Sequence, residues 1–322
     1  MHKHGSKAVV WISRVLGLII IGLAIAIGFN ASDLAAEAAT KSPSGAEPAQ
    51  ERLPVVLPKM PCEELARQDF TLLPDAMIQV LSATLVPATP SASEYCKVKG
   101  YIAPQIQFEL RLPTKTWTQR YLQIGCGGFC GSVDIDLKLE REGHFGGCLP
   151  QDIDEFALAS SNSGHVSSGG ADATWAKNAP QLKVDWGYRS EHTLATASRA
   201  IITTFYGQEP QYAYFAGCSN GGRQALMLAQ RYPDDFDGIL AGAPVNPVFG
   251  VVLTLAWNAK ANTAADGSPV LTLDQLPLIH QAALAECDGR DGLVDGQIDD
   301  PRACQFNPIR RYVRTARRSP TV

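Results

Sequence analysis

The stretch Gly217-Cys218-Ser219-Asn220-Gly221-Gly222 indicates both the fold of this chain and its candidate site. Residues 212–216 before it are rich in β-formers, and residues 223–232 after it have the pattern of a helix. A strand, a tight Gly-x-Ser-x-Gly turn and a helix form a nucleophile elbow, whose small residues let the serine hydroxyl stand above the sheet. The turn therefore predicts Ser219 as a nucleophile, with the next backbone N–H, that of Asn220, directed at a substrate oxygen.

A second glycine-rich stretch, Gly125-Cys126-Gly127-Gly128-Phe129-Cys130-Gly131, follows a strand-like run at 120–124. Esterases of the α/β-hydrolase type carry such a loop after an early strand, and one of its backbone N–H groups completes the oxyanion hole. Glycine lets backbone donors approach the reacting carbon without a side chain in the way. The alternative is a plain glycine turn with a Cys126–Cys130 disulfide. The elbow further along the chain favours the oxyanion role.

The composition is that of a globular protein. The 322 residues leave room for one large domain or two ordinary ones, and 45% hydrophobic residues can build a sizeable core. With 19% charged residues and a net charge of -4, nothing indicates nucleic acid as a partner. Eight cysteines are too many for an ordinary cytosolic enzyme, so we expect disulfides.

Residues 1–38 predict a signal peptide. Basic residues at positions 3, 7 and 14 come before an apolar run at 15–29, and Ala36-Glu37-Ala38 is a candidate cleavage site. The run is shorter than the ~20 residues that span a bilayer, which favours a secretory signal over an uncleaved anchor. We expect no stable membrane anchor, a flexible lead-in at 39–55, and a secreted or periplasmic protein.

Strand and helix patterns alternate along residues 56–248. Strands are predicted at 80–86, 96–102, 107–112, 120–124, 156–160 and 212–216, with a further, buried strand at 238–241, and helices at 62–68, 192–205 and 223–232. Ser190 is the expected N-cap of the helix at 192–205. A later helix is expected at 272–287, capped by Thr272 or Asp274 and closed by Gly289. The alternation predicts an α/β fold, with a mostly parallel sheet and helices on both faces.

An acidic, glycine-rich loop follows the last helix, and Cys287 and Cys304 bracket it in a way that suits a disulfide clamp. Calcium takes about six to eight oxygen ligands from carboxylates and backbone carbonyls. Three unpaired carboxylates in one turn would repel each other, which favours a bound cation over a solvated acidic turn. The EF-hand pattern is absent, because no bidentate Glu stands at the required position. The candidate ligands are the carboxylates of Asp288, Asp291 and Asp295 and the backbone carbonyls of Leu293 and Gln297.

The run from Gly217 to Gln224, with Arg231-Tyr232-Pro233 and residues 236–244, resembles the tannase and feruloyl esterase family. The mark of that family is a cysteine immediately before the catalytic serine. Cys126-Gly127-Gly128-Phe129-Cys130, Asn162-Ser163-Gly164-His165 and Gly187-Tyr188-Arg189 are also similar to it, and so is the acidic loop. The resemblance extends from about residue 62 to residue 306.

The resemblance implies an α/β-hydrolase domain, of which 56–248 is the N-terminal part, followed by the beginning of a lid domain at 249–308. It implies Ser219 as the nucleophile, and an oxyanion hole made by the N–H of Asn220 and that of Gly127 or Gly128. It also implies a structural Ca²⁺ bound by Asp288, Asp291, Leu293, Asp295 and Gln297.

The chain departs from the family where a catalytic base is needed. An acyl-transfer serine requires a base, and in this fold the order along the chain is Ser, then Asp, then His. His280 is the only histidine after Ser219, and the middle of a predicted lid helix is a poor place for a base. We expect His165 and His192 to be packed structural histidines, while His144 has no evident partner.

The cysteines also depart from the family's pattern. In the family, the cysteine before the serine bonds to one that follows the catalytic histidine, so Cys218 has no family partner in this chain. We expect Cys62–Cys96 and Cys287–Cys304 bridges. The pairing of Cys126, Cys130, Cys148 and Cys218 stays open.

Residues 309–322 contain five arginines and no acid, which predicts a basic, disordered tail. One interpretation is a basic arm for an anionic surface. The other is a coding region that is frame-shifted or ends early, which leaves the predicted lid domain at 249–308 incomplete. We favour the second interpretation, because it also accounts for the missing base, the missing acid and the unpaired cysteines.

These features predict a carboxylic ester hydrolase that acts through a serine acyl-enzyme. By resemblance, its substrates are small esters of hydroxycinnamic or gallic acids, such as those derived from plant polymers, and this incomplete chain is expected to be weakly active or inactive. One alternative is a non-catalytic, secreted calcium-binding protein. Another is a different serine hydrolase, a lipase or peptidase, that recruits His280 as its base.

Overall fold

The computed structural model describes residues 53–307, except 91, 134, 136–152 and 168–169. The predicted signal peptide, nearly all of the lead-in and the predicted basic tail lie outside the described residues, as do His144 and Cys148. Among the residues that are described, no helix is both long enough and apolar enough to cross a membrane.

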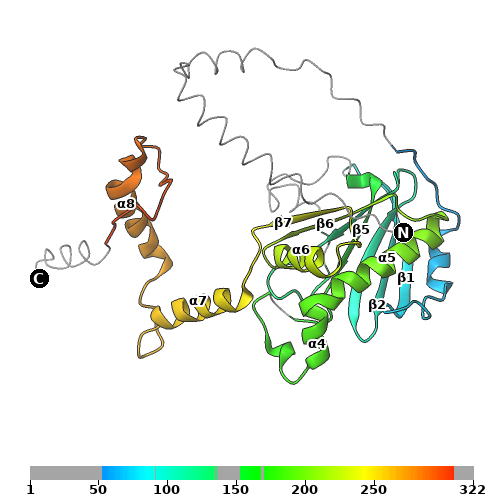
Figure 1. Ribbon diagram of the computed structural model, residues 1–322, viewed down its shortest axis with the longest axis horizontal. Helices are drawn as coiled ribbons and strands as arrows, with labels where there is room; N and C mark the ends of the chain where they lie inside the picture. Colours follow the sequence, from blue (N-terminus) through cyan, green and yellow to red (C-terminus); the bar gives the residue numbers. More distant parts are fainter. Residues whose placement is uncertain (1–52, 91, 134, 136–152, 168–169, 308–322) are drawn as a thin grey trace, which may run out of the picture. The chain divides into compact units, whose positions relative to one another are not determined.

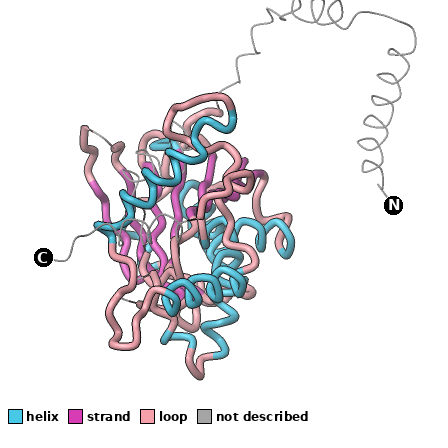
Figure 2. The backbone as a smooth tube through the Cα atoms, turned by 90° about the vertical axis from the view of Figure 1, so that its left-hand side faces the viewer, coloured by secondary structure: helices cyan, strands magenta, loops and turns pink. Residues whose placement is uncertain are grey.

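One seven-stranded sheet forms the centre of the fold, in the order β1-β2-β3-β5-β4-β6-β7 (Figure 1). Its strands are β1 (Ile78–Val86), β2 (Tyr95–Ile102), β3 (Ile106–Pro113), β4 (Arg120–Ile124), β5 (Phe156–Ser161), β6 (Tyr212–Cys218) and β7 (Gly238–Gly242). β1, β2, β3 and β5 pair antiparallel in succession, whereas β5, β4, β6 and β7 form a parallel half. Figure 2 shows these strands side by side. The sheet is thus mixed, and the predicted elbow belongs to its parallel half.

In the parallel half, β5, β4 and β6 bury side chains on both faces, and each face has its own cluster. Because successive side chains of a strand point to opposite sides, Tyr121, Ala159 and Phe215 lie on the same face as α5 (Ser190–Tyr206) and α6 (Asn220–Arg231). Figure 1 shows both helices on this side of the sheet. The other face carries a smaller cluster: Leu122, Ile124, Ile135, Ile153, Phe156, Leu158 and Ala216. Part of the segment between β4 and β5, residues 136–152, lies outside the described residues, so the expectation of helices on both faces stays a prediction for this face.

The predicted Cys62–Cys96 bridge is confirmed, with Cα atoms 5.5 Å apart. It joins a short 3-10 helix, η1 (Cys62–Arg67), to β2. Nearby, the rings of Trp117 and Tyr206 stack with centroids 3.8 Å apart, and both side chains are fully buried. The Tyr206 hydroxyl donates to the Pro113 carbonyl at 2.8 Å, so this large aromatic residue is buried without leaving its polar atom unpaired.

The expectation that Ser190 caps the helix over residues 192–205 is wrong. The chain is already helical in α4 (Pro180–Val184), passes through one π-helical turn, η5 (Asp185–Arg189), and continues directly into α5. Ser190 itself has helical dihedral angles, and its hydroxyl donates to the Glu191 carboxylate instead of accepting a hydrogen bond from a free backbone N–H. The sequence signal for the true start is Pro180, because proline suits the first turn of a helix.

The C-terminal elements differ from expectation in two respects. β7 is a strand, but its residues are half-buried or exposed and not buried as expected, because it is the edge strand of the described sheet. The helix α7 (Val248–Ala261) was not predicted; it is rich in apolar side chains, none of which is buried.

The later helix agrees with its prediction except at its end, because Gly289 lies inside a further helical turn and does not close it. Thr272 forms a capping box with Gln275 at a short 3-10 turn, η6 (Leu273–Gln275), and α8 (Leu276–Cys287) follows. The chain continues in the 3-10 turn η7 (Asp288–Asp291), which ends at Gly292. The expected Cys287–Cys304 disulfide is present. The remaining short turns are η3 (Ile153–Glu155) and η4 (Thr174–Ala176).

Candidate active site

Ser219 stands alone between a strand and a helix at the carboxyl end of the parallel strands. β6 ends at Cys218 and α6 begins at Asn220, and Ser219 between them has φ 59° and ψ -115°. This conformation is disfavoured for a residue with a side chain. It is held in place by its neighbours: the Ser219 N–H donates to the Gly242 carbonyl at 3.0 Å, and the Val245 N–H donates to the Ser219 carbonyl at 3.1 Å. The serine is half-buried, so its hydroxyl is not enclosed in the core.

The bend at Ser219 requires glycine on both sides. A Cβ atom at Gly217 would lie 2.3 Å from the carbonyl oxygen of Gly221, and one at Gly222 would lie 2.3 Å from that of Gly242. No side chain fits at such distances, and the atoms in the way belong to the backbone. The strand and the first turn of α6 can therefore approach each other this closely only with these glycines.

The glycine loop after β4 forms the second part of the site. Its ends are joined by a Cys126–Cys130 disulfide, which settles a pairing that the sequence left open. The Phe129 N–H donates to the Gly170 carbonyl at 2.7 Å and the Cys130 N–H to the Gly127 carbonyl at 3.0 Å. Gly127 and Gly128 are exposed. Within the described residues, no acceptor engages the N–H groups of Gly127, Gly128 and Asn220.

The loop lies directly against the first turn of α6. The Asn220 side-chain amide contacts the Cys126 carbonyl at 3.5 Å and the Cys130 sulfur at 3.2 Å. The Cys126 N–H donates to Oε1 of Gln224 at 3.1 Å. The structure therefore brings the two sequence motifs together, and their unengaged amides belong to adjoining backbone segments.

A buried polar cluster lies behind the loop and centres on Glu191. The side chains that donate to its carboxylate come from β4, from β5 and the loop after it, from α5 and from α6: Gln123, Ser161, Ser163, Ser190 and Gln224. Burial raises the pKa of Glu191 above its usual range, while these donors act in the opposite direction. Sequence reasoning missed this cluster, because none of its contacts follows a short motif.

Arg223 joins the elbow to the π-helical turn. Its Nε donates to the Asn220 side-chain oxygen at 2.7 Å, and its two Nη atoms donate to the carbonyls of Trp186 and Gly187 at 2.9 Å. The guanidinium also lies 4.0 Å from the centroid of the Trp186 ring. Burial lowers the pKa of Arg223 to about 10, so the side chain remains a cation at neutral pH.

None of the described histidines is a hydrogen-bond partner of Ser219. His165 is buried and stacks on Trp175 with centroids 3.8 Å apart, and His192 contacts Asp235 at 2.7 Å. Both are packed, as expected, and His192 is also hydrogen-bonded, but the expected hydrogen bond of His165 is missing, since neither of its buried ring nitrogens has a partner among the described residues. His280 is exposed on α8. The described residues thus supply a serine and unengaged amides, but no general base bound to that serine.

The acidic loop has the donor chemistry that suits calcium, but its carboxylates do not converge. Asp288 accepts the N–H groups of Asp295 and Gly296, Asp291 accepts that of Leu293 at 2.8 Å, and Asp295 accepts that of Gln297 at 3.0 Å. Among the described residues, no three His, Cys, Asp or Glu side chains gather as a metal-binding group. In this structure the loop is held by its own backbone amides and the Cys287–Cys304 bridge.

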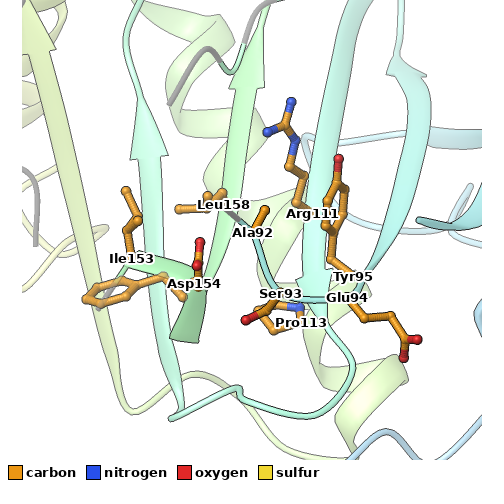
Figure 3. Close-up of a pocket in the computed structure, with 10 residues that line it drawn as sticks. Ala92, Ser93, Glu94, Tyr95, Arg111, Pro113, Ile153, Asp154 and Leu158 are labelled. Carbon is orange, nitrogen blue, oxygen red and sulfur yellow. The ribbon is translucent and has the colours of Figure 1, made fainter. Parts of the chain in front are cut away.

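The pocket in Figure 3 is lined by residues that precede β2, end β3 and begin β5, so it lies at the opposite end of the parallel strands from Ser219. Phe156 in its wall pairs with Arg120, at the amino ends of the parallel strands. Its walls are mainly apolar, and the Arg111 guanidinium is already paired with Glu109 at 2.8 Å. Since ligands of open α/β sheets bind at the carboxyl ends of the strands, the candidate active site is at Ser219 and not here.

A serine at a strand-to-helix bend, faced by a glycine loop with unengaged amides, defines the α/β-hydrolase class of fold and site. Comparison with known proteins narrows the class: residues 91–319 match the family described as tannase and feruloyl esterase. This chain belongs to that family.

Individual relatives agree with this membership. An uncharacterized esterase of Xanthomonas campestris pv. campestris is 36% identical over 247 residues, which are 74% of this chain and 39% of the relative. The mono(2-hydroxyethyl) terephthalate hydrolase of Piscinibacter sakaiensis is 35% identical over 69% of this chain and 41% of its own length. The chain therefore spans about two fifths of the length of these relatives.

Solved structures show the same relationship. The crystal structure of feruloyl esterase B from Aspergillus oryzae superimposes with a TM-score of 0.63 and 27% identity. The superposition covers 76% of this chain and 49% of that structure.

Proposed function

We propose that this chain carries the nucleophile and the oxyanion hole of a carboxylic ester hydrolase. The observation that supports this most directly is the half-buried Ser219 at φ 59°, next to the Cys126–Cys130 loop. In the proposed reaction, Ser219 Oγ attacks the ester carbonyl, and its proton passes to a base that the described residues do not supply. The alcohol leaves, an acyl-enzyme remains, and water then releases the acid.

The oxyanion hole is proposed to use the N–H of Asn220 and that of Gly127 or Gly128. These amides have no acceptor within the described part of the chain, so they are available for a developing negative charge. Asn220 is the first residue of α6, where the helix dipole adds a positive contribution. Removing a single donor of this kind typically costs about 10²–10³ in kcat.

The proposed substrates are small esters of aromatic acids such as hydroxycinnamic or gallic acid. The relatives named feruloyl esterase B support this substrate class. Two half-buried aromatic side chains, Phe129 of the glycine loop and Trp186 of the π-helical turn, lie beside the site with ring centroids 5.9 Å apart. Their faces offer an apolar surface to an aromatic acyl group.

Hydrolysis of methyl ferulate and methyl gallate by the purified chain tests the proposal. Because no base engages Ser219, we expect turnover at most ~10³–10⁴-fold above the uncatalysed rate, which is what binding and the oxyanion hole supply when a triad is incomplete. A rate no higher than the uncatalysed one would contradict the esterase assignment. Robust turnover that Ser219→Ala abolishes would instead contradict the expected weakness of this chain. If His280→Ala removed that turnover, His280 would be the base.

We also propose that the loop at 288–297 binds Ca²⁺ through Asp288, Asp291, Leu293, Asp295 and Gln297. The oxygen-rich donor set and the disulfide that closes the loop support this proposal, although the carboxylates must turn away from the backbone amides that they now accept. We expect millimolar calcium to raise the melting temperature relative to EGTA, and Asp291→Asn with Asp295→Asn to reduce that shift. An identical melting temperature with and without calcium would exclude the site.

A secreted or periplasmic location is proposed, with residues 1–38 as the signal peptide. Three disulfides among the described residues support an oxidising compartment. Cell fractionation with mass measurement of the mature N-terminus tests this, and an unprocessed chain in the cytosol would contradict it.

A further inference from the structure

Glu191 is a buried carboxylate that the proposed reaction does not use. It lies in the first turn of α5, and only 2% of its surface is exposed. All its hydrogen-bond partners within the described residues are neutral donors: Gln123 at 2.7 Å, Gln224 at 2.9 Å, Ser161 at 3.2 Å, Ser163 at 3.1 Å and Ser190 at 3.2 Å. Arg223 interacts with Glu191 electrostatically but forms no hydrogen bond with it. A buried carboxylate without a directly bound cation is costly, so its presence behind the glycine loop calls for a function.

Gln224 connects this carboxylate to the glycine loop. Its Nε2 donates to Glu191 Oε1, and its Oε1 accepts the Cys126 N–H at 3.1 Å. A carboxylate can only accept, so Glu191 determines which end of the Gln224 amide faces it. If the Gln224 amide were flipped, its oxygen would face the Glu191 carboxylate, and its NH₂ group would face the Cys126 N–H, so neither hydrogen bond could form. Glu191 therefore fixes Gln224 as an acceptor for the loop.

The hydrogen bond from the Cys126 N–H to Gln224 fixes the start of the loop, just before the two exposed glycines. The Gly125 N–H donates to the Ala216 carbonyl at 2.9 Å, and the exit of the loop is held by the Phe129 and Cys130 amides. Gly127 and Gly128 have no side chains to hold them, so the direction of their N–H groups depends on the peptide planes on either side.

We propose that Glu191 is a positioning residue that, through Gln224, orients the Gly127 and Gly128 amides of the oxyanion hole. This inference rests on the proposed function for its catalytic consequence, but the structural connection can be tested without catalysis. Two variants, Gln224→Met and Glu191→Leu, interrupt the hydrogen-bonded connection from Glu191 through Gln224 to the Cys126 N–H. Gln123→Met is the matched control, because Gln123 also donates to Glu191, at its other oxygen, and has no hydrogen bond to the loop.

The first measurement is hydrogen exchange of the peptide that contains residues 126–131 in the full chain. We expect about fivefold to tenfold faster exchange in Gln224→Met and in any folded Glu191→Leu, as for the loss of one hydrogen bond. We expect Glu191→Gln to keep slow exchange, because its amide oxygen can still accept from Gln224. Wild-type exchange in Gln224→Met, or an equal acceleration in Gln123→Met, would overturn the inference.

The second measurement separates kcat from KM on methyl ferulate. Oxyanion donors act mainly in the transition state, so Gln224→Met should lower kcat about 10-fold or more with little change in KM, whereas Gln123→Met should not. An unchanged kcat in Gln224→Met would overturn the catalytic part. If the wild-type chain does not hydrolyse the ester, the proposed function fails, and the exchange measurement alone then decides whether Glu191 positions the loop.

Discussion

The unusual backbone of Ser219 is maintained by its neighbours. A non-glycine residue at φ 59° carries about 1–3 kcal/mol of strain, and such strain persists only where the surroundings determine the conformation. Here the Gly242 carbonyl and the Val245 N–H bind the serine backbone on both sides. The same conformation turns the side chain out of the strand. Strain and exposure therefore occur together at the residue that the sequence motif singles out.

His165 gives a prediction about pH. It is buried against Trp175, and burial lowers its pKa below the ordinary value of 6.5, because the charged imidazolium is desolvated there. The unfolded chain then binds the proton more readily than the folded chain. The contribution of neutral His165 to the free energy of unfolding is fully present above pH 6.5. It is lost as the pH falls through the lowered pKa of the folded state. The melting temperature should decrease between pH 7 and pH 5 more in the wild type than in His165→Phe.

His165→Phe is the matched variant, because it keeps a ring against Trp175 and removes the titrating group. The measurement is the difference in melting temperature between the two pH values for each protein. An equal decrease in both proteins would show that other groups cause the acid sensitivity.

At the scale of elements, the approach of β6 to α6 depends on glycine. Gly217→Ala would place a methyl group 2.3 Å from a backbone oxygen, so we expect an unfolding free energy lower by about 1–3 kcal/mol. Gly127→Ala is the control, since nothing lies within 4 Å of its Cβ position, and its stability should stay within about 0.5 kcal/mol. Urea denaturation measures both values. A Gly217→Ala chain as stable as the wild type would show that the turn is not as tight as described.

The elements that sequence patterns predicted well are those with a local cause. β4 agrees with its predicted bounds, and β1, β2 and β3 agree to within two residues, because alternating or β-branched runs ended by turns indicate strands. The Thr272 cap follows a local motif in the same way. The true start of the helix before Ser190 was missed, since a π-helical turn at Asp185–Arg189 carries the chain through a glycine and two aromatic residues.

The residues of the candidate site form the same two groups: those that a local motif predicts and those that it does not. Ser219 and the glycine loop could be found from the sequence, because each is a contiguous motif. Glu191 and Gln224 could not, since their importance lies in contacts between residues 33 positions apart that only the packed sheet brings together. Arg223 and Gln224 stood inside the recognised stretch, but a motif does not show which partners its side chains bind.

At the scale of the whole molecule, the chain contains a defined part of a family member. The described residues hold the sheet, the elbow and the glycine loop, and the chain matches about two fifths of the length of the relatives. Acyl transfer needs a base and a carboxylate that orients it, and no described histidine binds Ser219. We therefore separate two properties: the proposed role of Ser219 as a nucleophile, and rapid turnover, which requires a base.

The central claim, that Ser219 is the acyl-accepting residue, is tested most directly by covalent labelling. The full chain is incubated with a fluorophosphonate probe, digested, and mapped by mass spectrometry, with an active feruloyl esterase as the positive control. We expect a slowly formed adduct on Ser219, absent from Ser219→Ala. An adduct on another residue, or none after prolonged incubation that labels the control completely, would contradict it.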